Sequence, residues 1–104
     1  MTTFFISRHP GAREWAEKTG VWVDRWVEHL DLVEIRPGDQ VLGTLPVHLA
    51  AAVCERGARY VHLSLELPAD QRGRELTGAD LVQFGARLEA FEVRRLSSTD
   101  PIPT

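Results

Sequence analysis

Residues 40–67 have the sequence pattern of a βαβ unit, in which a strand, a helix and a second strand follow one another. The first strand contains Val41 and Leu42. The second strand covers residues 60–67, where large apolar residues alternate with polar ones. Two strands joined through a helix are normally parallel neighbours in one sheet. This segment therefore predicts an α/β domain whose ligand site lies beyond the carboxyl ends of its strands.

The helix of this unit is expected to start near Thr44 and to end at Gly57. Threonine is a residue type that caps helix N-termini, and Pro46 suits the first turn because no backbone N–H is needed there. Gly57 can take the left-handed conformation that ends a helix. Four residues at helical spacing predict one apolar face: Val47, Ala50, Ala51 and Cys54.

The segments before this unit predict two further strands and a helix. Residues 2–7 are β-prone and apolar, as in a buried first strand. Pro10 opens a helix that ends at Gly20. Residues 21–30 are ambiguous, since their apolar residues fit both an alternating and a helical spacing. We expect a strand there, because it completes a second βα repeat.

The predicted fold class is α/β, a single Rossmann-like domain with a mostly parallel sheet of about four strands and helices on both faces. A short helical turn is expected at residues 31–35. The 104-residue chain is long enough for one such domain, residues 1–96, followed by an aperiodic tail, residues 97–104, that we expect to be flexible. A last helix is expected to begin at Thr77 and to have one apolar face made of Leu81, Phe84, Gly85, Leu88 and Phe91.

The composition limits the partners and the location of the protein. A net charge of −3 and a pI of about 5.8 argue against binding of long nucleic acids, which requires a broad basic surface. A small anion in a local basic pocket remains compatible with this charge. The single cysteine, Cys54, fits a reducing cytoplasm, and we expect it to be a buried structural thiol. No apolar run is long enough for a membrane span, so we expect a cytoplasmic protein without a membrane partner.

Three loops are expected to meet at the carboxyl-terminal edge of this sheet: residues 7–12, 43–48 and 64–74. Two of them lead into helix N-termini, whose free N–H groups and dipoles favour anions. This convergence predicts a site for a phosphate-bearing ligand. The polar candidates in these loops are Ser7, Arg8, His9, Thr44, His48, Ser64, Arg72 and Arg74.

Arg8 and His9 form the pair with the clearest chemical potential. An arginine guanidinium has the fork geometry that suits phosphate. An imidazole, whose ordinary pKa is about 6.5, can act as a general acid or base at neutral pH. The alternative is that His9 only caps the first helix and Arg8 forms a surface ion pair.

The other candidates each have a structural alternative as well. His48 either lines the same pocket or is a solvated residue on the helix surface. Ser64, at a strand end, either contacts the ligand or is structural. Arg72 and Arg74 either close over an anion as a mobile flap or belong to a solvated charged loop.

Several motifs of common enzyme classes are absent. There is no Gly-x-Gly-x-x-Gly or Walker lysine loop, which disfavours dinucleotide binding and ATP hydrolysis. The four histidines lack HExxH spacing, the single cysteine provides no cysteine pair, and no Gly-x-Ser-x-Gly elbow is present. We therefore expect neither a metal site nor a cofactor.

Five short motifs together resemble a family of small CRISPR-associated proteins from type III systems. These proteins are stand-alone relatives of the CARF (CRISPR-associated Rossmann-like) sensor domains. The similarity covers roughly residues 3–93. The motifs are ISRHPGA at 6–12, PGD at 37–39, GTLPV at 43–47, ARYVHLSLEL at 58–67 and RGREL at 72–76.

This resemblance implies a function in antiviral signalling. Members of the group are implicated as ring nucleases, which cut cyclic oligoadenylate second messengers. The implied fold is CARF-like, the implied ligand is a cyclic oligoadenylate, expected to be cyclic tetra-adenylate, and the implied assembly is a homodimer that binds the ring across its two-fold axis. In the implied metal-independent reaction, a ribose 2′-hydroxyl attacks the neighbouring phosphorus and the 5′-oxygen leaves. The products are linear and carry 2′,3′-cyclic phosphates.

Arg8 and His9 are the catalytic residues expected for this reaction. Arg8 would neutralise the phosphate, and His9 would protonate the leaving oxygen or merely bind. The loop around Thr44 would donate N–H groups to a second phosphate. The full set of expected substrate-binding residues is Ser7, Gly43, Thr44, Leu45, His48, Ser64, Arg72 and Arg74.

Two functions of other classes also fit the sequence. The first is a non-catalytic sensor or sponge that binds the messenger, or a regulator of a CRISPR effector. The second is a protein–protein adaptor that uses its tryptophans, Trp15, Trp22 and Trp26.

Overall fold

The computed structural model describes residues 1–96, so the predicted tail, residues 97–104, lies outside the described residues. The strands are β1 Thr3–Ile6, β2 Arg25–Val27, β3 Gln40–Gly43, β4 Arg59–Ser64 and β5 Arg87–Phe91. They form one sheet in the order β2-β1-β3-β4-β5. The first four strands are parallel and β5 is antiparallel to β4. The sheet is mostly parallel, as predicted, but it has five strands instead of about four.

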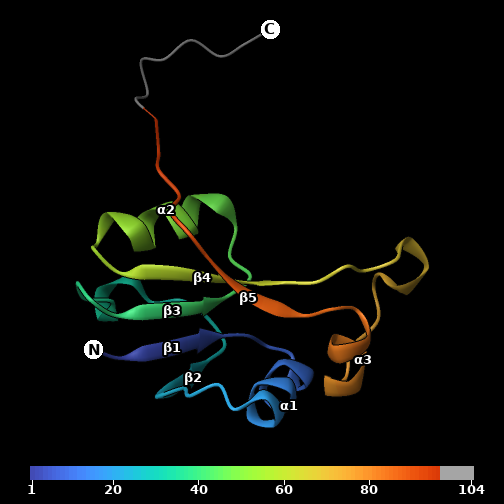
Figure 1. Ribbon diagram of the computed structural model, residues 1–104. Coiled ribbons are helices and arrows are strands. Elements are labelled where there is room, and N and C mark those ends of the chain that lie inside the picture. Colours follow the sequence, from blue (N-terminus) through green and yellow to red (C-terminus); the bar gives the residue numbers. More distant parts are fainter. Residues whose placement is uncertain (97–104) are drawn as a thin grey trace, which may run out of the picture.

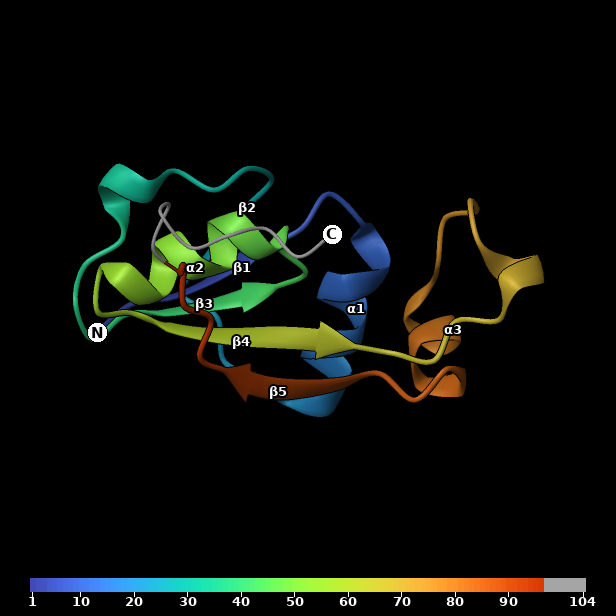
Figure 2. The same ribbon diagram turned by 90° about the horizontal axis from the view of Figure 1, so that it is seen from above.

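Helices cover both faces of this sheet (Figures 1 and 2). One face carries α1, Pro10–Thr19, and α3, Gly78–Gln83, and the other carries α2, Val47–Glu55. Two short 3-10 helices, η1 Leu32–Glu34 and η2 Ala69–Gln71, lie in the connections, and η1 falls within the predicted turn. Phe4 belongs to the apolar cluster under α2 and Phe5 to the cluster under α1 and α3, because successive residues of a strand point to opposite faces.

The central unit has the predicted order, but its helix begins later than expected. The N-cap of α2 is Pro46, and no side chain caps the helix. The Thr44 hydroxyl donates instead to the Leu63 carbonyl, with an Oγ1–O distance of 3.1 Å. Gly57 has the predicted left-handed conformation, with a φ of 80°. Val47 is 71% exposed, so the predicted apolar face is wrong at that position, and the buried residues of α2 are Ala50, Ala51 and Val53.

The ambiguous segment at residues 21–30 does form a strand, but only over the three residues of β2. Trp26, at the middle of β2, stacks on Phe5 with 4.6 Å between the ring centroids. Trp22 precedes the strand and is 77% exposed. The pairing of this short strand with β1 depends on a tertiary contact, which explains why its limits could not be located from the local pattern.

The C-terminal part differs most from the prediction. The predicted helix from Thr77 is only the six residues of α3, which is followed by Gly85 with a φ of 70°. Residues 87–91 then form β5, which pairs with β4 from Tyr60↔Phe91 to Ser64↔Arg87. The apolar spacing fits a helix as well as a strand, and the open edge of β4 favours the strand by supplying backbone hydrogen-bond partners.

The surface of residues 1–96 includes exposed apolar side chains but no candidate membrane segment. Within this range no helix combines the length and the apolarity that crossing a membrane requires.

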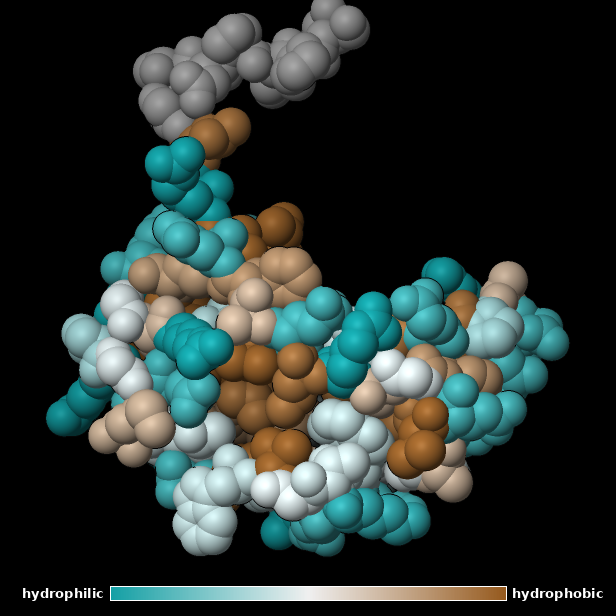
Figure 3. Space-filling model, in the orientation of Figure 1, coloured by the Kyte–Doolittle hydropathy of each residue, from teal (hydrophilic) through white to brown (hydrophobic). Residues whose placement is uncertain are grey.

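Two apolar side chains predicted on helix faces are less buried than expected. Phe91 on β5 is 48% exposed, and Figure 3 shows hydrophobic surface near this strand between hydrophilic residues. Cys54 is half-buried, so the expectation of a buried thiol is wrong, and its Sγ accepts the Val93 N–H at 3.5 Å.

Candidate functional site

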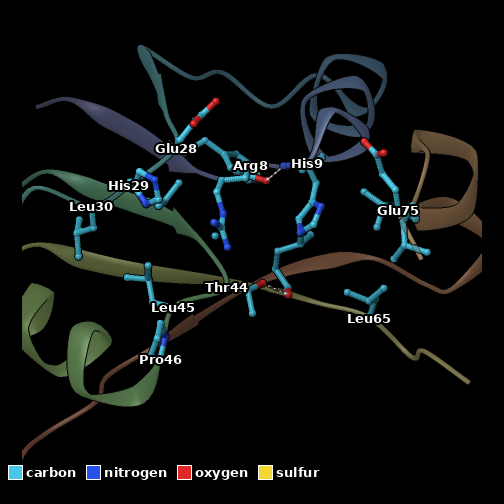
Figure 4. A pocket seen from close by; sticks show the side chains of 18 of the residues that line it. Arg8, His9, Glu28, His29, Leu30, Thr44, Leu45, Pro46, Leu65 and Glu75 are labelled. Atoms are coloured by element: carbon cyan, nitrogen blue, oxygen red, sulfur yellow. Dashed lines mark hydrogen bonds between the residues drawn. The ribbon is translucent and has the colours of Figure 1, made fainter. Parts of the chain in front are cut away.

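A large cavity lies where the loops after β1 and β3 diverge. The chain leaves β1 toward β2 on one side of the sheet, and it continues from β3 to β4 on the other side. In open α/β sheets, ligands bind beyond the carboxyl ends of the strands at such a reversal. The cavity has a volume of about 1040 Å³. Its walls are formed by segments that follow all four parallel strands, and Figure 4 shows the side chains that line it.

Seven of the ten predicted site residues line this cavity. They are Ser7, Arg8, His9, Gly43, Thr44, Leu45 and Arg74. The walls between them are largely apolar and include Leu30, Leu49, Leu63, Leu65 and Leu67.

Arg8 and His9 follow β1 directly and are both exposed. His9 occupies the N-cap position of α1, but its side chain makes no capping hydrogen bond. Its backbone N–H donates to the Ser7 hydroxyl at 3.1 Å. Within residues 1–96, Arg8 forms no ion pair with a carboxylate and its guanidinium donates no hydrogen bond to protein. The capping and ion-pair roles considered as alternatives for this pair are therefore not observed in the described residues.

The loop after β3 is held in place by backbone geometry and by one buried tyrosine. Gly43 has a φ of 146°, and a Cβ there would lie 2.6 Å from the Ile6 carbonyl oxygen. The Tyr60 hydroxyl accepts the Leu45 N–H at 2.9 Å and lies 3.3 Å from the Gly43 carbonyl oxygen. The Leu45 N–H is thus already bonded to protein, so this arrangement offers it no second role as a phosphate donor.

Tyr60 also contacts His62, its neighbour on the same face of β4. The hydroxyl oxygen lies 2.6 Å from the His62 Nδ1. Because the hydroxyl carries one proton, it can donate to either the imidazole or the Gly43 carbonyl, and the histidine tautomer decides which. Burial raises the pKa of Tyr60, so the hydroxyl remains protonated and the loop remains bonded to it at neutral pH.

Three predicted residues do not line the cavity: His48, Ser64 and Arg72. At the start of α2, the cavity side is formed by the N-cap Pro46 and by Leu49, three residues later, so the exposed His48 between them projects elsewhere. Ser64 lies between Leu63 and Leu65, which line the cavity, so the alternation of the chain directs it to the other face. Arg72 is exposed and precedes the lining segment that starts at Gly73.

Arg74 lines the cavity but is already engaged by protein groups. Its Nη1 lies 2.9 Å from the Asp80 Oδ2, and its Nε donates to the Gln71 Oε1 at 2.7 Å. Its hydrogen bond to Asp80 raises the pKa of Arg74 and holds the pKa of Asp80 far below its usual range. The arginine therefore connects the loop before α3 to the start of that helix.

Several lining residues were not singled out from the sequence. The segment after β2 contributes Glu28, His29 and Leu30, and the segment before α3 contributes Glu75. The Ser7 N–H donates to the Val27 carbonyl at 3.0 Å, so the chain after β2 leaves the sheet beside the chain after β1. If the end of β2 had been located at Val27, His29 would have been a candidate site residue, because it follows the carboxyl end of a parallel strand.

The described residues offer acid–base and phosphate-binding groups. Within residues 1–96 no three His, Cys, Asp or Glu side chains are grouped so that they could hold a metal ion. Imidazoles can transfer protons, and a guanidinium can bind a phosphate. Largely apolar walls with a few polar groups are typical of small-molecule sites.

Fold and site together define a small α/β protein with an open cavity at the carboxyl-terminal edge of a mostly parallel sheet. The chain belongs to a CRISPR-associated family: residues 4–94 match the family described as "Putative CRISPR-associated protein (Cas_VVA1548)". Comparisons with curated proteins and with solved structures gave no match.

Proposed function

We propose that this protein is a metal-independent ring nuclease that cleaves cyclic oligoadenylates, with cyclic tetra-adenylate as the expected ring, in type III CRISPR antiviral signalling. The observation that carries the proposal is Arg8, which lies in the cavity next to His9 without a carboxylate partner in residues 1–96. A cation in this situation favours an anionic ligand. Membership of a CRISPR-associated family supports the same proposal.

The proposed reaction uses the substrate's own nucleophile. A ribose 2′-oxygen attacks the adjacent phosphorus, and the 5′-oxygen leaves, which gives a linear product with a 2′,3′-cyclic phosphate. Arg8 stabilises the charge that develops on the phosphoryl oxygens, and His9 protonates the leaving oxygen. The leucines of the cavity contact the adenine rings.

The strand order supports a CARF-like, Rossmann-like classification. The order 2-1-3-4-5 is common among doubly wound α/β domains, which bind nucleotides at the switch point between strands 1 and 3. We also propose a homodimer in which two such cavities face one ring. The cytoplasm is the proposed location.

The first prediction concerns Arg8→Ala, tested with cyclic tetra-adenylate in the presence of EDTA, followed by chromatographic separation of the products. Loss of one donor to the developing charge lowers kcat by about 100-fold or more. The matched control is Arg94→Ala, at an exposed arginine that does not line the cavity, and it should cleave like the unmodified protein.

Three results would contradict parts of this proposal. Equal small losses in the two arginine variants would remove Arg8 from the mechanism. Cleavage that disappears with EDTA would exclude the metal-independent reaction. An intact ring that co-migrates with the protein would identify a sensor or sponge that binds without cutting.

A further inference from the structure

The cavity contains a second exposed imidazole besides His9. It belongs to His29, in the segment that connects β2 to η1. In the view of Figure 4, the Arg8 side chain extends into the cavity between His29 on one side and His9 on the other. The Arg8 guanidinium and two imidazoles thus line the same cavity.

The sheet itself places these three residues together. Ile6 of β1 is in register with Val27 of β2, and the Ser7 N–H donates to the Val27 carbonyl at 3.0 Å. The residues that follow each strand therefore emerge from the same edge, with His9 three residues after Ile6 and His29 two residues after Val27. Their position at one cavity follows from the parallel pairing of β1 and β2 and needs no rearrangement of the loops.

Cleavage by an internal hydroxyl makes two demands on the protein. A base must take the proton of the 2′-hydroxyl, and an acid must supply one to the 5′-oxygen. The attacking and leaving oxygens lie on opposite sides of phosphorus, so the two groups must stand on opposite sides of the residue that holds the phosphate. His9 alone meets only one of these demands.

We infer that His29 is the general base and His9 the general acid of the reaction, on either side of Arg8; this inference rests on the proposed ring-nuclease function. Neutral His29 removes the 2′-hydroxyl proton while the 2′-oxygen forms its bond to phosphorus. The bond from phosphorus to the 5′-oxygen breaks, and its electron pair takes a proton from cationic His9. The product is a 2′,3′-cyclic phosphate with a free 5′-hydroxyl, and exchange of one proton each with water restores both imidazoles.

The other charged groups of the cavity are less suited to the role of base. Glu28 and Glu75 also line it, but in Figure 4 the Glu28 carboxylate points away from Arg8, and Glu75 lies on the α1 side, beyond His9. Arg74 is paired with Asp80 at 2.9 Å. Among the titratable side chains labelled in Figure 4, the two imidazoles lie on either side of the Arg8 guanidinium in this view, and both carboxylates contribute to the charge of the cavity.

His29→Ala and His9→Ala provide the first test, with kcat and the dissociation constant for cyclic tetra-adenylate measured separately. Each variant should lose about 10²–10⁴-fold in kcat, the usual contribution of one acid or base. The dissociation constant should change little.

The pH dependence of kcat/KM provides a second measurement. It should be bell-shaped in the unmodified protein, and each variant should lose one limb of the bell. The control is Val33→Ala, at an 81% exposed residue of the adjoining η1, which should retain full activity.

A modified ring separates the two roles. Sulfur in place of the 5′-bridging oxygen of the scissile linkage makes a leaving group that needs no protonation. Cleavage of this ring should be restored in His9→Ala and should stay slow in His29→Ala.

The outcomes separate this inference from the function on which it rests. If the unmodified protein does not cut the ring, the proposed function and the inference both fail. If it cuts but His29→Ala keeps full kcat, or weakens only binding, His29 is no base and the ring nuclease stands. Restoration of His29→Ala by the sulfur-containing ring would likewise overturn the assignment.

Discussion

Gly43, the last residue of β3, lines the cavity and lies close to the backbone of β1. Its φ of 146° is strained for any residue with a side chain, and an added Cβ would lie 2.6 Å from the Ile6 carbonyl oxygen. A backbone oxygen cannot move away as a flexible side chain could. The bare backbone at Gly43 therefore allows the loops after β1 and β3 to enclose one cavity.

Gly43→Ala should reduce the free energy of unfolding by about 1–3 kcal/mol, the range for a residue held in a strained backbone conformation. Urea denaturation measures this loss. The control is Gly38→Ala, which has a φ of 88° but no atom within 4 Å of an added Cβ. A loss in Gly43→Ala no larger than that in the control would mean that contact with Ile6 does not constrain the strands.

Site residues were predicted correctly where the sequence showed the end of the preceding strand, and they were missed where it did not. The apolar run before Ser7 and the βα loop at Gly43 marked two strand ends, and parallel pairing brought these loops together. His29 was missed because the end of β2 depends on a hydrogen bond between Ser7 and Val27, which no local pattern reports. The hydrogen bond between Arg74 and Asp80 was not predicted, because it joins two segments that no local pattern connects.

At the level of elements, α3 is short and depends on its N-terminus. Its capping box is complete: the Thr77 hydroxyl accepts the Asp80 N–H at 3.1 Å, and the Asp80 Oδ2 accepts the Thr77 N–H at 2.9 Å. The segment before it packs tightly on α1, since a Cβ on Gly11 would overlap the Leu76 carbonyl. The start of α3 thus holds Leu76, one of the residues that line the cavity, in place against α1.

Thr77→Ala should cost about 1 kcal/mol of stability, as is typical for loss of an N-cap side chain. Val82→Ala is a suitable control on the same helix, because Val82 is 60% exposed and takes no part in the cap. Urea midpoints of the two variants measure the difference. Equal midpoints would show that the capping box does not stabilise the helix.

The elements with strong local signals were predicted correctly. Pro10 and Gly20 bound α1 as expected, and β3, α2 and β4 follow the order inferred from residues 40–67. The helix predicted beyond Gln83 was wrong because five residues that pair with an open sheet edge satisfy an alternating and a helical pattern equally well. The choice was made by tertiary pairing, which lies outside the segment itself.

For the molecule as a whole, two carboxylates from other parts of the chain fix the start of β1, the strand between β2 and β3. The Asp39 Oδ1 accepts the Thr2 N–H at 2.9 Å, and the Asp24 Oδ2 accepts the Thr3 N–H at 2.8 Å. These backbone hydrogen bonds lower the pKa of both aspartates. Asp39 is only 5% exposed, and its other oxygen accepts the Arg36 N–H. The carboxylates are therefore structural, and their ionised form holds the sheet together at its amino-terminal edge.

This arrangement predicts that the protein loses stability in acid. Because the pKa of each aspartate is lower in the folded state, the unfolded chain binds more protons as the pH falls. The stabilisation is complete above the pKa of an unfolded aspartate, about 3.9, and is lost progressively below it. Urea midpoints measured from pH 7 to pH 3 should fall most steeply below about pH 4.

The variant Asp39→Asn should be less stable at pH 7, and its stability should depend less on pH, because one of the titrating groups is gone. Asp70→Asn, at an exposed residue of η2, should follow the unmodified protein. If Asp39→Asn loses as much stability between pH 5 and pH 3 as the unmodified protein does, the carboxylate of Asp39 does not account for the acid sensitivity, and the fixing of β1 depends on other contacts.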